Sequence, residues 1–177
     1  MTRRRPDLTA HLEALRRYAR VLARNGMEAD DLVQGALLRA VERLHQWRED
    51  GNLRVWLLSI LHNHFVDTAR AQAAAAARDG AWAGLAPASA PAQGEDAARL
   101  AQLRAAVAAL PHDQREALHL VALEGLAVAE AAAVLGVPPG TVMSRLGRAR
   151  AALRRFEEGG SPAGRPHLRV VGGSDGA

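Results

Sequence analysis

The chain has 177 residues, 49% of them hydrophobic, which is enough for one medium-sized domain or two small ones. It contains no cysteine, which excludes disulfides, thiol chemistry and cysteine-ligated zinc, and no apolar run of the ~18 residues that suggest a membrane span. The formal net charge is +4, and all 23 basic residues are arginine; codon bias explains their number at least as well as function does, so only their clustering is informative. These properties predict a cytoplasmic protein without membrane insertion.

Two amphipathic helices are predicted at the N-terminal end. The first carries an apolar stripe over residues 8–22 and is expected to close at Asn25–Gly26. The second opens at a run of acidic residues, which favour the positive end of the helix dipole. Asp31, Gln34 and Leu38 lie on a face separate from its apolar side. Leu38 there is either a contact for a protein partner or a stray exposed leucine.

A third helix follows a polar loop at residues 45–52, which holds Trp47. Its apolar residues recur at helical spacing over 53–61 and are expected to point inward. His62 and His64 lie two residues apart and therefore on different sides of a helix, so no shared metal ion is expected. An alanine run at residues 73–77 can prolong this helix.

The periodicity stops between residues 76 and 96. Glycine, proline and serine occur there at irregular intervals, which is typical of a flexible linker. The sequence therefore predicts a first domain at residues 1–75, a linker at 76–96 and a second domain at 97–156. A tail at 157–177, rich in glycine, proline and serine, is predicted to be disordered.

The second domain begins with a helix whose apolar stripe includes Leu100, Leu103, Val107 and Leu110. A helix at residues 112–124 is expected to end at Gly125. A short apolar helix at 128–135 follows, and Gly136 suits a left-handed C-terminal cap. Two prolines then fit the first turn of another helix. A helix, a tight glycine turn and a basic helix form the layout of a helix-turn-helix.

The last helix is expected to be apolar on one side and cationic on the other. The apolar stripe consists of Val142, Leu146, Ala149 and Leu153. From Thr141 to Arg155 the chain has five arginines and no acidic residue. Apolar spacing alone does not exclude a solvated cationic helix in an ordinary bundle, but the turn chemistry favours a helix that enters a DNA groove.

Two segments resemble the bacterial sigma factors of RNA polymerase, in the small extracytoplasmic-function (ECF) group. The first contains DDLVQGALLRA at 30–40 and NLRVWL at 52–57, and is similar to region two of the family. The second runs from residue 110 to 150, includes LGVPPGTV at 135–142, and is similar to region four. Three positions depart from the family pattern, which often has an acid, an aromatic, and a basic or polar residue where this chain has Gly35, Val128 and Met143.

The resemblance implies an all-α fold of two small helical domains, a region-two bundle and a region-four helix-turn-helix, joined by a flexible linker. It implies a sigma factor that binds core RNA polymerase and directs it to promoter DNA for transcription initiation. The minus thirty-five element would be read as duplex and the minus ten element as melted strand. An anti-sigma factor is expected as a further partner. The resemblance implies no catalytic residue, cofactor or metal.

The resemblance also assigns residues to each contact. The polymerase-binding residues would be Asp31, Gln34 and Leu38. The minus ten element would be contacted by Trp47, Asn52, Arg54, Asn63, Asp67 and Arg70. The minus thirty-five element would be contacted by Arg115, Thr141, Ser144, Arg145 and Arg148. Trp47 either stacks on a base or packs on the core, whereas the stripe position of Trp56 predicts a core residue.

Three other classes of protein compete with this interpretation. A sigma-like mimic would bind an anti-sigma factor without touching DNA, and it would not need the basic front of the last helix. A stand-alone helix-turn-helix regulator would leave the surface at residues 30–40 unexplained. An enzyme is not expected, because the chain has no glycine-rich phosphate loop after a strand, no HExxH motif and no cysteine nucleophile.

Overall fold

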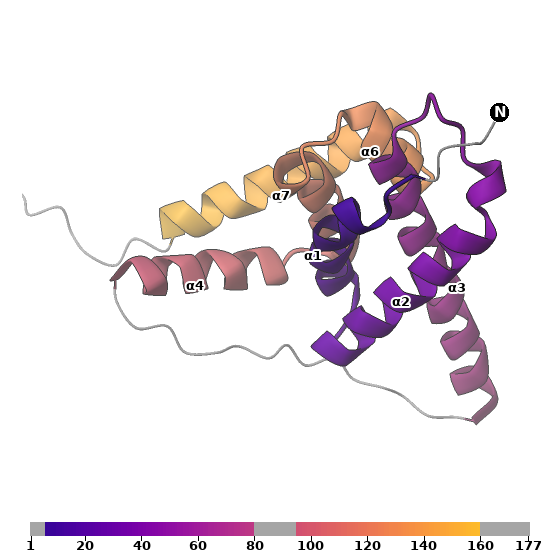
Figure 1. The fold of residues 1–177 in the computed structure, drawn as a ribbon. Coiled ribbons are helices and arrows are strands. Elements are labelled where there is room, and N and C mark those ends of the chain that lie inside the picture. Colours follow the sequence, from indigo (N-terminus) through magenta and orange to yellow (C-terminus); the bar gives the residue numbers. More distant parts are fainter. Residues whose placement is uncertain (1–5, 80–94, 160–177) are drawn as a thin grey trace, which may run out of the picture.

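The structure is a computed structural model that describes residues 6–79 and 95–159. Within those ranges the chain is helical and contains no β-strand. The N-terminal domain consists of η1 (Thr9–His11), α1 (Leu12–Leu22), α2 (Gly26–Glu42), η2 (Leu44–Gln46) and α3 (Leu53–Asp79). The C-terminal domain consists of α4 (Glu95–Ala108), α5 (His112–Leu118), the π-helical turn η3 (His119–Leu123), α6 (Val128–Leu135) and α7 (Pro139–Gly159) (Figure 1). The predicted all-α fold with two helical domains is confirmed.

The helix ends differ from the predicted domain limits at both sides of the linker. Helix α3 continues to Asp79, inside the predicted linker, and α4 already begins at Glu95. The middle of the predicted linker and the predicted tail beyond residue 159 lie outside the described residues. In the described part of the chain, no helix combines the length and the apolar character that a membrane span requires.

Asn25 begins the second helix rather than closing the first. Its Oδ1 accepts a hydrogen bond from the backbone N–H of Glu28 at 2.9 Å, and its backbone is extended, as in an N-cap residue. Helix α1 has already ended at Leu22. The predicted position was wrong because asparagine suits both a helix start and a left-handed helix end, and only the backbone geometry separates the two.

The helix-turn-helix has the predicted turn chemistry. Gly136 caps α6 in the left-handed region at φ +63°, and Gly125 takes the same conformation at φ +67° after η3. Residues other than glycine rarely adopt this backbone conformation. Helix α7 begins at Pro139, and the carbonyl of Pro138 accepts a hydrogen bond from the N–H of Thr141 at 2.9 Å. The sequence therefore located both ends of the turn.

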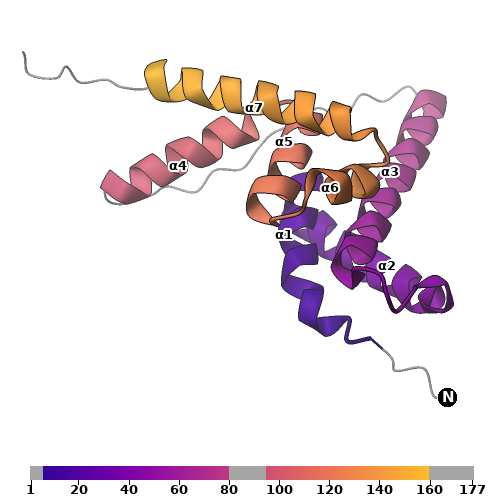
Figure 2. The same cartoon turned by 90° about the horizontal axis from the view of Figure 1, so that it is seen from above.

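The two domains are packed against each other. Helices α1 and α3 contact α5, η3 and α6, and one cluster of buried apolar side chains spans both domains (Figure 1, Figure 2). The N-terminal side contributes Tyr18, Leu57 and Leu61, and the C-terminal side contributes Leu120 and Val134, all of them at most 1% exposed. We call this packing of the two domains the closed arrangement. Helical periodicity could not predict it.

Helix α4 packs less completely than its stripe predicts. It lies beside α7, away from the N-terminal domain in both views (Figure 1, Figure 2). Leu110 is buried, but Leu100 and Leu103 remain 47% and 44% exposed. The apolar stripe therefore predicted the helix correctly, but its leucines are less buried than the stripe suggests.

The structure gives a physical reason for the departure from the family pattern at Gly35. A Cβ atom at this position of α2 would overlap the imidazole of His64 on α3. The His64 side chain therefore lies where a side chain at position 35 would otherwise begin. The glycine at position 35 leaves room for the ring, so the two residues are expected to depend on each other.

A double-mutant cycle tests this coupling. In a His64→Ala background, Gly35→Ala is expected to raise the free energy of unfolding by about 1 kcal/mol, because alanine is the better helix former. In the wild type the same substitution must displace the imidazole, so its effect is expected to be less favourable by at least about 1 kcal/mol. Urea denaturation of the four proteins measures both values. Equal effects in the two backgrounds would show that the ring and the glycine are not coupled.

Candidate nucleic-acid interface

Helix α7 has a buried apolar side and an exposed basic side. Val142, Leu146 and Ala149 are at most 2% exposed, whereas Ser144 and Arg148 point to solvent. Thr141 and Arg145 lie half-buried on the flank between them. The expected division of this helix into two faces is confirmed, and the side that carries Ser144 and Arg148 is exposed to solvent.

Three of the predicted duplex-binding residues also have contacts within the protein. Arg145 places Nε 3.3 Å from Oδ2 of Asp113, and Ser144 donates its hydroxyl to the carbonyl of Thr141 at 2.9 Å. Arg115 donates to the carbonyl oxygens of residues 108 and 110, at 2.8 Å and 3.3 Å, and so closes the end of α4. Arg148 is exposed, which makes it the most direct candidate for DNA contact.

The residues predicted to contact the melted strand fall into two groups. Asn63, Asp67 and Arg70 are exposed along one face of α3, where Asp67 forms an ion pair with Arg39 at 2.9 Å. Trp47, Asn52 and Arg54 lie together at the start of α3, next to the C-terminal domain. The second group is therefore the part of the predicted strand-binding site that the domain packing affects.

A cavity of about 520 Å³ opens between the start of α3 and α6. The indoles of Trp47 and Trp56 line it on the N-terminal side, and Ala129, Glu130 and Ala133 line it from α6. Trp56, predicted as a core residue, packs against the core cluster and is half-buried, because it also borders this cavity. Trp47 is half-buried as well and borders the same space, so stacking on a base remains a prediction for this residue.

Asn52 both caps α3 and contacts the other domain. Its Oδ1 accepts from the N–H groups of Arg54 and Val55 at 3.1 Å and 3.3 Å, as an N-cap residue does. Its Nδ2 donates to Oε1 of Glu130 on α6 at 2.9 Å. The amide predicted to contact DNA is thus occupied by a carboxylate of the C-terminal domain.

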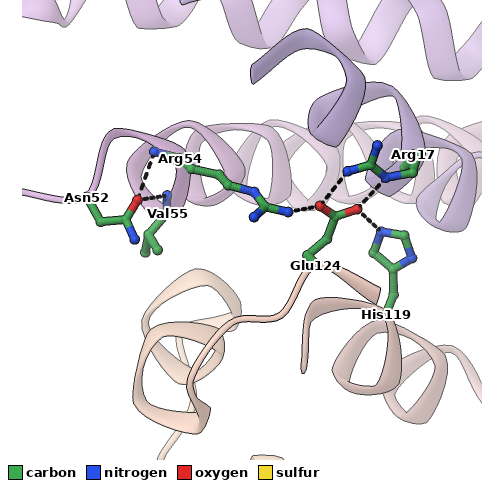
Figure 3. A network of polar contacts seen from close by, with 6 residues as sticks. All are labelled: Arg17, Asn52, Arg54, Val55, His119 and Glu124. Atoms are coloured by element: carbon green, nitrogen blue, oxygen red, sulfur yellow. Dashed lines mark hydrogen bonds and ion pairs between the residues drawn. The ribbon is translucent and has the colours of Figure 1, made fainter. Parts of the chain in front are cut away.

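A second carboxylate is held between the domains, at Glu124 after η3. Arg17 of α1 donates to it from Nε and Nη2 at 2.8 Å and 2.9 Å, and Arg54 donates from Nη2 (Figure 3). His119 places Nε2 3.2 Å from the same carboxylate. Burial alone would raise the pKa of Glu124, but the two guanidinium groups outweigh it and lower the pKa. Burial, with the nearby arginines, lowers the pKa of His119.

A third interdomain cluster surrounds Glu116 on α5. The Tyr18 hydroxyl lies 3.3 Å from Oε1, Nδ1 of His62 lies 3.2 Å from Oε1, and Nδ1 of His112 lies 3.3 Å from Oε2. Burial would raise the pKa of Glu116, but hydrogen bonds from His112 and His62 lower it to about 2. Burial raises the pKa of Tyr18 well above its usual value, so its hydroxyl keeps the proton that it donates.

Sequence reasoning missed both buried carboxylates, although a signal was present. Glu116, Leu120 and Glu124 follow one another at intervals of four, which places two acids on the side of the helix that holds a buried leucine. Acids on an apolar stripe indicate paired charges in the core or interface. The π-helical turn over 119–123 lies between the two acids and has a different number of residues per turn from an α-helix. Glu124, which follows this turn, contacts Arg17 and Arg54.

The face predicted to bind polymerase is exposed. Asp31 and Gln34 point to solvent on α2, and Leu38 is 63% exposed. Val41, one turn further along α2, is 60% exposed and extends the apolar part of this face. The closed arrangement therefore covers part of the predicted strand-binding site and leaves the predicted polymerase-binding face open.

Comparison with known proteins identifies both domains. Residues 8–62 match the family described as the Sigma2 domain of PhyR, and residues 100–153 match Sigma-70, region 4. The ECF RNA polymerase sigma factor EcfG of Rhodopseudomonas palustris is 39% identical over 150 residues, which cover 84% of this chain and 82% of the relative. SigM of Mycobacterium tuberculosis is 36% identical over 156 residues, covering 82% of this chain and 72% of the relative.

Solved structures agree with the sequence matches. The sigma factor RpoE of Bartonella quintana, in complex with the anti-sigma factor NepR, has a TM-score of 0.74 and 33% identity over 86% of this chain and 94% of its own. The PhyRSL–NepR complex of Sphingomonas has a TM-score of 0.59 and 26% identity over 96% and 94% of the two chains. With both regions present in family order, the chain belongs to the ECF sigma factors, which bind core RNA polymerase and direct it to promoters.

Proposed function

We propose that this sigma factor divides its contacts among three surfaces. The exposed face of α2 at Asp31, Gln34 and Leu38 binds core polymerase, the N-terminal domain holds the melted minus ten strand, and α7 reads the minus thirty-five duplex. The observation that supports this most directly is the exposed basic front of α7 over a buried apolar back. Domain limits of 1–75 and 97–156, a location in the cytoplasm and the absence of catalytic activity belong to the same proposal.

In vitro transcription tests the proposal as a whole. The purified chain and core polymerase are mixed with a library of promoter fragments, and the transcripts are sequenced to locate their start sites. Transcripts that start downstream of a shared pair of elements are the expected result. A chain that neither associates with core polymerase nor yields transcripts would contradict the proposed function.

The polymerase-binding face is tested at Leu38. Replacing this 63% exposed leucine by aspartate is expected to weaken binding to core polymerase at least about tenfold, because a charge would enter an apolar contact. The stability of the free protein should not change, since the side chain packs little. Fluorescence titration with core polymerase measures the affinity. Leu123, which is 65% exposed and lies outside this face, provides the matched control as Leu123→Asp.

The duplex-binding face is tested at Arg148. Arg148→Ala is expected to weaken binding to a minus thirty-five duplex by about 1–3 kcal/mol if it reads a base, and to flatten the salt dependence by about one unit if it contacts a phosphate. Arg150, also exposed, lies about 200° around the helix and serves as the matched control. Titrations at several salt concentrations separate the two roles. An affinity and slope equal to those of the wild type would exclude Arg148 from the interface.

A sigma-like mimic is the second candidate. The family match over residues 8–62 is to a domain of PhyR, and PhyRSL in complex with NepR is one of the similar structures. We propose an anti-sigma factor as a partner in either case, because similar sigma factors occur in such complexes. The exposed arginines of α7 favour the sigma factor. Transcripts in the polymerase assay decide between the two, since a mimic would produce none.

A further inference from the structure

Two arginines of the N-terminal domain converge on one point beside the strand-binding residues. Arg17 comes from α1 and Arg54 from the first turn of α3, and both donate to the carboxylate of Glu124 (Figure 3). Arg17 does so with the paired Nε and Nη2 donors, at 2.8 Å and 2.9 Å. A guanidinium fork fits a phosphate as well as a carboxylate. The pair is therefore a site for an oxyanion, and Arg17 was not among the residues predicted to contact DNA.

The anion that fills this site in the closed arrangement comes from the other domain. The Glu124 side chain is fully buried, whereas the side chains of Arg17 and Arg54 remain 48% and 30% exposed. Withdrawal of the C-terminal domain would expose both guanidinium groups to solvent. Arg54 also has a buried Nε–H without a hydrogen-bond partner, so the carboxylate leaves part of its binding capacity unused.

The neighbouring contacts repeat this pattern. Glu130 of α6 accepts the hydrogen bond from Nδ2 of Asn52, and α6 forms one wall of the cavity lined by Trp47 and Trp56. The C-terminal domain thus places one carboxylate on the pair Arg17 and Arg54 and another on the amide of Asn52. Its helix α6 lines the same cavity as the two tryptophans. A single strand would need the same groups for its phosphates and its bases.

We propose that Arg17 and Arg54 bind a backbone phosphate of the melted promoter strand, and that Glu124 occupies this phosphate site while the two domains are closed. The inference rests on the proposed role of the N-terminal domain in minus ten binding. The C-terminal domain then competes with the strand for the same surface, and the exposed α2 face lets polymerase bind the closed form first. Opening makes the strand-binding surface available.

Removing the charge of Glu124 tests the competition. The free full-length chain is titrated with a short fluorescent single-stranded oligonucleotide. Glu124→Gln is expected to bind it at least about tenfold more tightly than wild type, because a larger fraction of the chain is open. Glu13→Gln, at an exposed position of α1, makes the same change in net charge and is expected to match wild type. Equal affinities of the two variants, with native helicity by circular dichroism, would overturn the proposal.

A reversible cross-link tests the occlusion without touching the charged groups. Gln46 and Ala133 line the cavity from opposite domains and are both exposed, and the chain has no native cysteine. In the variant Q46C/A133C, a cleavable bifunctional maleimide is expected to abolish oligonucleotide binding, and cleavage should restore it. The same variant capped with a monofunctional maleimide is the control. Undiminished binding by the cross-linked chain would overturn the proposal.

The role of Arg17 is tested in the opened protein. In the Glu124→Gln background, Arg17→Gln is expected to weaken oligonucleotide binding severalfold and to flatten the salt dependence by about one unit. Arg16→Gln, at the neighbouring exposed arginine, makes the same change in charge and should have little effect. Equal effects of the two substitutions would remove Arg17 from the phosphate site. Transcription with core polymerase, measured separately, shows whether the proposed function holds regardless of this result.

Discussion

Replacing Glu116 by alanine is expected to lower the free energy of unfolding by about 3 kcal/mol near neutral pH. The carboxylate is 5% exposed and joins three helices, with the Tyr18 hydroxyl from α1, Nδ1 of His62 from α3 and Nδ1 of His112 from α5 all within 3.3 Å. Like Glu124, it holds α1 and α3 against the C-terminal domain. Loss of the carboxylate therefore affects both domains at once.

The size of the expected effect follows from the groups left behind. Tyr18 is fully buried, and His62 is 9% exposed, so neither can turn to water when the shared acceptor disappears. The Tyr18 hydroxyl also lies 3.0 Å from Nδ1 of His62, so these two groups can still pair with each other. The expected loss is that of their hydrogen bonds to a charged acceptor, each of which contributes about 1.5–3 kcal/mol. Glu116→Gln keeps one acceptor oxygen and the shape of the side chain, and is expected to lose less than the alanine variant.

Urea denaturation followed by circular dichroism measures these differences. Glu13→Ala is the matched control: it removes a carboxylate that is 74% exposed and paired with Arg16 on the surface of α1. Its expected effect is within about 0.5 kcal/mol, as for other exposed ion pairs. If Glu116→Ala cost no more than Glu13→Ala, the buried cluster would not stabilise the packing of the domains.

The sequence predicted features that depend on local patterns. The left-handed turn at Gly136 and the two faces of α7 follow from residue type and spacing along one segment, and both were located correctly. The fold of the family followed from two recognisable segments in order. Such features could be predicted because neighbouring residues determine them.

The packing of the two domains could not be predicted in this way. It depends on pairs such as Arg17 with Glu124 and Tyr18 with Glu116, which lie 107 and 98 residues apart. Periodicity assigns each residue to a face of its own helix but does not say which face of another helix it meets. The predicted linker suggested two separate modules, whereas the buried ion clusters join them. Asn52 and Arg54 were predicted to contact DNA, and their contacts with the C-terminal domain were not expected.

Acidification is expected to separate the two domains. Burial lowers the pKa of His119, and the two arginines beside it act in the same direction against the attraction of Glu124. The closed form therefore binds fewer protons at this histidine than an open form in which its pKa is ordinary. The stabilisation is complete above the ordinary value of 6.5 and is lost as the pH falls below it.

The two buried carboxylates also stabilise the closed form at higher pH, and their contribution is lost at a lower pH than that of His119. The pKa of Glu116 falls to about 2 and that of Glu124 also lies below its ordinary value of 4.5, so both favour the closed form above pH 4.5. Their contribution disappears as the pH falls below 4.5 toward the lowered pKa values. For Glu116 the shift from 4.5 to about 2 corresponds to about 3 kcal/mol.

Energy transfer between dyes on the two domains, recorded as a function of pH, measures the separation. The wild type is expected to begin opening below pH 6.5 and to open further below 4.5. His119→Gln removes the first titrating group, so its opening should be confined to the range below 4.5. If both proteins began to open at the same pH, His119 would not be the group that responds first.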